Sequence, residues 1–307
     1  EEEKPEEDDA VHLPEKMHIS KLHKLLTQNC EAFFEIRSGF DYEKFEKQLP
    51  QTDDPETLNH LDSSAVQKAL WAMRTAGIDE KVWQAQVQRV RLLPVNGENT
   101  YKELREPVTA LTDEYVEAFK NQTGLLCEQT FCGTTLFGTL PLPAPLGESV
   151  CRYEVLFSKR SPQKIFKFYL EHLLLTCQIG QEKTVTGKLV FAREEENSKL
   201  CFFPPVHDAA EKLENFMKTA LSTYSSPRPL PIFAAASYEY CKRSLAKNPK
   251  TPPEKDPAVR KQFLESDLQY HKVIGEFFDE DNFNDEEFRE LAKFLFSDIA
   301  QIKPGEL

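Results

Sequence analysis

The sequence has little of what would carry a protein into a membrane or hold it on a nucleic-acid backbone. It contains no run of eighteen apolar residues and no cationic stretch leading into an apolar one, so we expect neither a transmembrane nor a secreted protein and take the cytoplasm as its location. Positive charge is scarce: 38 Lys and Arg stand against 51 Asp and Glu, a formal net charge of -13. Because nonspecific affinity for DNA comes mainly from cations that neutralise phosphates, any contact with nucleic acid should be local.

The chain also lacks the motifs of common catalytic and metal sites. It has no phosphate-binding GxxxxGK[ST] loop, no dinucleotide-binding GxGxxG and no nucleophile-elbow sequence. Its seven cysteines are scattered and odd in number, which favours reduced thiols over a disulfide framework. Cys127 and Cys132 are the closest pair, but no second Cys or His pair accompanies them at zinc-ligand spacing. We therefore expect no metal site and no cofactor.

The beginning of the chain is acidic and is followed by helical patterns. Residues 1–17 open with EEEKPEEDDA, a charge run without an apolar face, and are expected to be a linker or a disordered tail. The opening Glu1, in place of an initiator Met, leads us to expect a piece of a longer protein. Residues 18–123 are predicted to form a helical subdomain, in which Gly39 and Gly77 end two of the helices. The predicted helices are Ile19–Ile36, Pro55–Ala76, Asp79–Val90 and Glu98–Asn121.

Residues 124–307 combine strand and helix patterns. Two β-rich runs, Thr134–Leu142 and Ser149–Ser158, flank a Pro/Gly turn and are expected to form a hairpin; a helix is predicted directly after Ser161 and Pro162. Further strands are predicted at Lys183–Ala192 and Leu200–Phe203, and further helices at Asp208–Thr223, Phe233–Ala246 and around Phe288–Ile299. The predicted fold class is α/β, with one mixed β-sheet flanked by helices, and with the first three strands named here in that sheet.

The order of hairpin, strand and helix resembles the core of restriction-endonuclease-like nucleases. In the RecB-type members, Gly-x-x-Asp ends one strand and Asp/Glu-x-Lys lies on the next. Here GTLP puts Pro141 at the position of the Asp, and thirteen residues later Glu154 and Leu156 stand at the acidic and Lys positions. Two carboxylates hold the divalent metal and the Lys orients the attacking water, which Pro and Leu cannot do. The resemblance implies a nuclease fold without catalytic residues.

A more specific resemblance extends along most of the chain. The run SPQKIFKFYLEHLLLTC followed by GKLVFAREEENSKLCFFPP is similar to the C-terminal region of RecC, the gamma subunit of exodeoxyribonuclease V. LNHLDSSAVQKAL and AVRKQFLES fit the same family in the same order, so that the resemblance covers about His18 to Ile302. It implies a non-catalytic domain of a helicase-nuclease complex that processes broken DNA ends. RecB-like and RecD-like subunits would be its partners, duplex DNA would be the substrate of the whole complex, and the chain alone should be monomeric.

Two other functions remain open at this stage. One is a free-standing scaffold without a role at DNA. The other is an active metal-dependent nuclease that takes its groups from other positions, such as Glu148, Glu154 and Lys159. A compact basic cluster near the strand-helix junction is the candidate DNA contact, although a solvated helix face explains it as well. It consists of Lys159, Arg160, Lys164 and Lys167.

Overall fold

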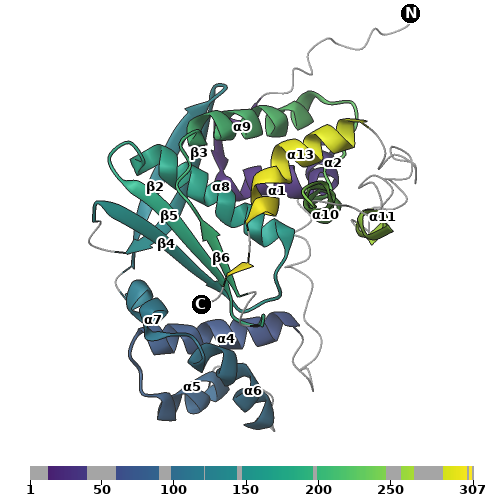
Figure 1. The fold of residues 1–307 in the computed structure, drawn as a ribbon. Coiled ribbons are helices and arrows are strands. Elements are labelled where there is room, and N and C mark those ends of the chain that lie inside the picture. Colours follow the sequence, from purple (N-terminus) through teal and green to yellow (C-terminus); the bar gives the residue numbers. More distant parts are fainter. Residues whose placement is uncertain are drawn as a thin grey trace, which may run out of the picture.

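The computed structural model describes residues 13–39, 60–89, 98–120, 122–143, 147–195, 199–246, 257–265, 286–302 and 304–305. Within them, most of the strands lie between residues 122 and 203, and helices predominate before and after that part of the chain (Figure 1). In chain order the elements are β1 Lys16–His18, α1 Ile19–Thr27, α2 Asn29–Ser38, α4 His60–Thr75, η1 Glu80–Val82, α5 Trp83–Arg89, α6 Glu98–Thr109, α7 Asp113–Lys120, β2 Gln122–Phe131, β3 Thr134–Pro143, β4 Ser149–Leu156, α8 Pro162–Ile179, β5 Thr184–Phe191, β6 Leu200–Phe203, α9 Ala209–Ser225, α10 Ala234–Ser244, α11 Pro257–Glu265, α13 Glu286–Gln301 and β7 Pro304–Gly305.

The strands form two small mixed sheets. In the first, β3 lies between β1, to which it is parallel, and β2, to which it is antiparallel. In the second, the order is β4-β5-β6-β7; β4 and β5 are parallel, and the other pairs are antiparallel. The predicted α/β fold with helices flanking mixed strands is therefore confirmed. The prediction of one sheet is wrong, because β3 belongs to the first sheet whereas β4 and β5 belong to the second.

The composition of β3 explains why it does not form a hairpin with β4. A two-residue turn joins β3 to β2, a strand that the sequence patterns did not predict. Thr135 donates its N–H to the carbonyl of Glu15, so odd-numbered residues of β3 direct their backbone groups away from β2. Pro141 and Pro143 stand at such positions, beyond the end of β1, and have no N–H to offer a second neighbour. This edge of β3 cannot continue into the second sheet.

Helix α8 is the element on which both sheets pack. It contacts β2, β3, β5 and β6 as well as helices α1, α9, α10 and α13, and Figure 1 shows it between the strands and these helices. It begins where the sequence predicted, with Pro162 in the first turn and Ser161 as the N-cap, whose Oγ accepts the N–H of Lys164. The larger apolar core surrounds it and includes Leu22, Leu26, Leu136, Leu170, Phe191, Leu213 and Phe296.

A second apolar core lies between β4 and β5 and the helices α4 to α7 (Figure 1). Its members from the strands are Val155, Phe157, Val190 and Ala192, and those from the helices include Val66, Leu70, Trp71, Trp83, Tyr101, Leu104 and Tyr115. Elements α1 and α2 belong instead to the larger core around α8. The helices predicted as one group in residues 18–123 thus pack in two places, and the boundary at residue 123 stays a prediction.

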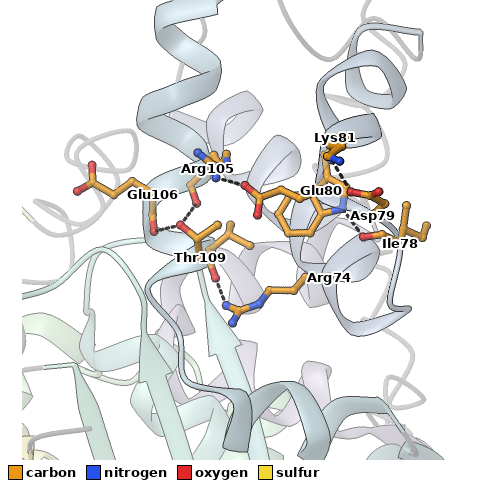
Figure 2. A network of polar contacts seen from close by, with 10 residues as sticks. Arg74, Ile78, Asp79, Glu80, Lys81, Arg105, Glu106 and Thr109 are labelled. Atoms are coloured by element: carbon orange, nitrogen blue, oxygen red, sulfur yellow. Dashed lines mark hydrogen bonds and ion pairs between the residues drawn. The ribbon is translucent and has the colours of Figure 1, made fainter.

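Polar contacts join the helices of this second group (Figure 2). At the end of α4, Nη1 of Arg74 donates to the carbonyl of Val108 in α6 at 2.5 Å. Arg105 of α6 forms an ion pair with Glu80 of η1. Asp79 is the N-cap of η1 and accepts the N–H of Lys81 at 3.0 Å. These contacts fix α6 and η1 to α4 in addition to the apolar packing.

Two of the predicted helices are interrupted. The helix predicted at Ile19–Ile36 divides into α1 and α2 at Gln28, which has a non-helical backbone and forms an isolated antiparallel bridge with Phe233. The helix predicted at Glu98–Asn121 divides into α6 and α7. Helix α6 ends two residues after Pro107, which has no backbone N–H to donate within the helix. Gly39 and Gly77 end helices as predicted, with left-handed φ of 65° and 71°. Residues 55–59 of the helix predicted at Pro55–Ala76 lie outside the described residues.

Candidate functional site

The three positions that the nuclease pattern singles out lie on two different sheets. Pro141 is exposed on β3, where it pairs with Gly124 of β2. Glu154 and Leu156 are half-buried on β4, where they pair with Leu189 and Phe191 of β5. Of the three, only Glu154 carries a group that could bind a metal ion or a proton. Its surroundings therefore decide what this part of the fold can do.

Glu154 is bound by a buried arginine that sequence reasoning missed. Arg152 lies two residues earlier on β4, which puts both side chains on the same face of the strand. Its Nη2 lies 2.8 Å from Oε2 of Glu154 and 2.5 Å from Oε2 of Glu171, which comes from α8. Arg152 is 2% exposed, and Glu171 is also buried. One guanidinium thus binds two carboxylates between the sheet and the central helix.

An aromatic ring completes the enclosure of Arg152. The guanidinium carbon lies 4.1 Å from the centroid of the Phe168 ring, a cation–π contact. Opposite Arg152 on β5 stands Gly187, and a Cβ added there would lie 2.7 Å from Cε1 of Phe168. Only glycine allows the ring to take this position. The sequence signal for the cluster is the arginine on a strand that otherwise buries apolar residues, but its partner Glu171 is nineteen residues away and on a helix.

His172 borders the same cluster. Its Nε2 lies 3.0 Å from the carbonyl of Pro204, so the proton sits on Nε2 and donates. Burial, assisted by the charge of Arg152, lowers the pKa of His172 to about 4. Nδ1 of His172 and both Nε and Nη1 of Arg152 are buried without a hydrogen-bond partner among the described residues. Burial also raises the pKa of Glu171, an effect that Glu154 strengthens and Arg152 opposes.

The second set of candidate nuclease groups does not come together. Glu148 precedes β4 and Glu154 lies six residues further on, a distance of about 20 Å along an extended strand. Ligands of one magnesium or calcium ion lie about 2.0–2.6 Å from it, so these two carboxylates cannot share a metal. Lys159 is exposed beyond the end of β4, and its carbonyl accepts the Nζ of Lys164 at 3.2 Å. The arrangement offers no common centre for catalysis.

The basic cluster gains a member from a distant helix. Lys159 and Lys167 are exposed, and the backbone N–H of Arg160 donates to Oε1 of Glu194. Burial, together with the charge of Lys68 on α4, lowers the pKa of Lys164. Lys68 thus adds a positive charge that acts on Lys164. Sequence reasoning missed Lys68 because it belongs to the preceding helical region.

The fold is an α/β domain with two mixed sheets packed on a central helix, and Arg152 binds one carboxylate from a strand and one from that helix. Residues 14–245 match the model of the RecC C-terminal domain, and the chain belongs to this family. The match confirms the resemblance that the sequence showed. No curated protein matches the chain. Within the described part of the chain, no helix combines the length and apolar character needed to cross a membrane.

Nine chains of solved structures match this chain, among them the following two. One is the crystal structure of a candidate exonuclease from Eubacterium rectale, with a TM-score of 0.41, 10% sequence identity, and coverage of 69% of this chain and 82% of the other. The second is the structure of SSO0001, with a TM-score of 0.24, 12% identity, and coverage of 73% of this chain and 100% of the other.

Proposed function

We propose that this chain is a non-catalytic interaction domain of a RecC-like subunit. The subunit would belong to a RecBCD-type helicase-nuclease, an exodeoxyribonuclease V, that processes double-strand DNA ends for recombinational repair. Membership of the RecC C-terminal domain family supports the assignment to such a complex. RecB-like and RecD-like subunits are the partners we propose for it, and DNA ends would be bound by the whole complex. The cytoplasm is the location that this function requires.

The observation that carries the non-catalytic part of the proposal is the contact between Arg152 and Glu154. Nη2 of Arg152 lies 2.8 Å from Oε2 of Glu154, which puts a guanidinium, the most persistent cation among the side chains, against this carboxylate. At 2% exposure it has no solvated position within reach to which it could turn away. A divalent ion at Glu154 would have to lie beside this fixed positive charge, which repels it. Together with Pro141 and Leu156, the ion pair leaves Glu154 bound to a cation and without the Asp and the Lys of the nuclease pattern.

A cleavage assay tests this part directly. The purified chain should not cleave single- or double-stranded DNA in the presence of magnesium or manganese ions. Glu154→Gln is the variant to compare, because it keeps the size of the side chain and removes its charge. Metal-dependent cleavage that is present in the native chain and absent from this variant would establish the alternative, an active nuclease.

Association with the subunits tests the other part. The chain should bind a purified RecB-like or RecD-like subunit of the same complex in a stable, stoichiometric assembly that sedimentation can resolve. A chain that binds neither subunit, while remaining folded by circular dichroism, would favour the free-standing scaffold.

A further inference from the structure

A cavity of about 750 Å³ opens beside the central helix, and His172, which borders the Arg152 cluster, is one of the residues that line it. Its walls come from α8, from β6 and the connection to α9, and from the end of α13. Phe202, Phe203, Val206 and Ile302 make much of the wall apolar. Phe202 is 46% exposed, although the interior of a fold is the usual place for a side chain of this size. The cavity is within the size range of sites that hold small ligands or side chains of a partner.

The polar end of the cavity carries more negative than positive charge. Oδ2 of Asp298 accepts the hydroxyl of Tyr169 at 2.5 Å and the Nζ of Lys212 at 2.6 Å. The same Nζ lies 3.4 Å from Oδ2 of Asp208. Burial alone would lower the pKa of Lys212. Its hydrogen bond to Asp298 and the charges of Asp298 and Asp208 outweigh burial and raise the pKa above its usual value, so Lys212 is an ammonium. Two carboxylates therefore share one cation, which leaves one negative charge. The partial positive charge at the start of α9, about half an elementary charge, does not balance it.

Asp208 is the carboxylate that can still accept hydrogen bonds from a ligand. It occupies the N-cap position of α9, where an aspartate normally accepts a backbone N–H of the first turn, a contact worth about 1 kcal/mol. Here the side chain makes no such hydrogen bond. It is 53% exposed and lines the cavity with its single ion pair to Lys212. An incoming donor could still bind it.

We propose that this cavity receives an arginine side chain of a partner protein, together with an apolar residue next to it in the partner. The guanidinium would bind the carboxylate of Asp208 through two parallel hydrogen bonds and lie on the exposed ring of Phe202. The neighbouring apolar residue would fill the space beside Phe203 and Val206. Arginine suits the place better than lysine, because its planar group pairs with a carboxylate and stacks on a ring at the same time. The net charge of -13 also favours a basic partner segment.

This inference rests on the proposed function as an interaction domain and names the chemistry of one contact. The probes are three blocked dipeptides, Ac-Phe-Arg-NH2, Ac-Phe-citrulline-NH2 and Ac-Phe-Glu-NH2, titrated into the full chain and followed by ¹H–¹⁵N NMR. Citrulline has nearly the shape of arginine without its charge. We expect the arginine peptide to shift signals of residues around the cavity, and to bind about tenfold more tightly than the citrulline peptide, because one charged hydrogen-bonded pair is lost.

Asp208→Asn should weaken the binding of the arginine peptide by a similar factor. Glu211→Gln, on the same helix but outside the cavity, should leave that binding unchanged. Equal binding of the arginine and citrulline peptides, or preference for the glutamate peptide, would overturn the inference. If the arginine peptide fails to bind while a RecB-like subunit binds, the inference is wrong and the proposed function stands. If the peptide binds at the cavity and neither subunit does, the cavity keeps its assignment and the proposed complex is wrong.

Discussion

Arg152 of β4 and Glu171 of α8 form an ion pair across the interior of the fold, with 2.5 Å between Nη2 and Oε2. The pair joins the strand that carries the nuclease-like position to the helix on which both sheets pack. Because Arg152 also binds Glu154, its removal would leave two carboxylates close together without a cation. The same arginine therefore stabilises the core through Glu171 and keeps Glu154 from being free to bind a metal ion.

Arg152→Met should destabilise the protein by about 3–5 kcal/mol at neutral pH, the usual cost of removing one partner of a buried pair. Urea denaturation followed by circular dichroism measures the change. Arg105→Met is the matched control, because its ion pair with Glu80 is about 40% exposed on both sides and is expected to contribute less than about 1 kcal/mol. Similar losses in the two variants would show that the Arg152 pair is not important for stability.

Much of the α/β pattern could be predicted from the sequence, and the missing parts have physical causes. The start of α8 follows from Ser161 and Pro162, whose cap and fixed φ act locally. The division into two sheets depends on β2, whose sequence QTGLLCEQTF alternates poorly because its outer face is mostly exposed. Without β2, β3 has no partner in the sequence pattern except β4. The wrong single sheet follows from that one missing strand.

The site was harder to predict than the fold, because its contacts join residues that are distant in the sequence. Pro141 and Leu156 identify what the nuclease pattern lacks, and this could be seen from the sequence. That Arg152 binds Glu154 could not be predicted from the sequence, since a single charged residue on a strand forms no repeating pattern that would indicate its burial or its partner. The closeness of Lys68 to Lys164 depends on how α4 packs on the second sheet. Such relationships need the tertiary structure.

Stability should fall as the pH drops from 7 to 5, because His23 and His172 are buried in the neutral form. Burial lowers the pKa of each to about 4 from 6.5. The unfolded chain binds protons on these rings near pH 6.5 while the folded chain does not, so the stabilisation is present above pH 6.5 and lost as the pH falls toward 4. Between pH 7 and pH 5 each histidine should cost about 2 kcal/mol.

Urea midpoints of the native chain and of His172→Gln at the two pH values measure this dependence. The glutamine can still donate to the carbonyl of Pro204 but cannot take up a proton. Its variant should therefore lose about 2 kcal/mol less than the native chain on acidification. An unchanged pH dependence would mean that His172 is already accessible to protons in the folded state.

The turn between β2 and β3 contains a cysteine in a conformation that suits asparagine or glycine. Cys132 has a φ of 52° and Gly133 a φ of 81°, and positive values at both central residues define the type I′ hairpin turn. Asn-Gly is the preferred pair for this turn, and a left-handed conformation costs other residues about 1–2 kcal/mol. Cys132→Asn should raise the free energy of unfolding by about 0.5–1 kcal/mol. Gly133→Ala, at the neighbouring position, should lower it.

The basic cluster around the start of α8 should not give the isolated chain a strong affinity for DNA. The net charge of -13 opposes phosphate binding, because the long-range field of the chain repels an anion. We expect dissociation constants no tighter than about 10⁻⁴ M for blunt-ended or circular duplex at physiological salt, the weak end of the nonspecific range. Labelled duplex titrated at two salt concentrations gives both the affinity and its salt dependence.

The informative variant replaces the four predicted residues with glutamine, and a fifth change at Lys68 extends it to the whole cluster. If the basic residues of the cluster only form a solvated helix face, replacing them should alter the affinity for duplex DNA no more than replacing the same number of ion-paired lysines elsewhere. Suitable control positions are Lys102, Lys120, Lys218 and Lys242. Tight binding with a steep salt dependence, lost in the cluster variant and kept in the control, would make duplex DNA a direct partner of this domain. The slope of log affinity against log salt would then count the phosphates that the domain neutralises, at about 0.9 per contact.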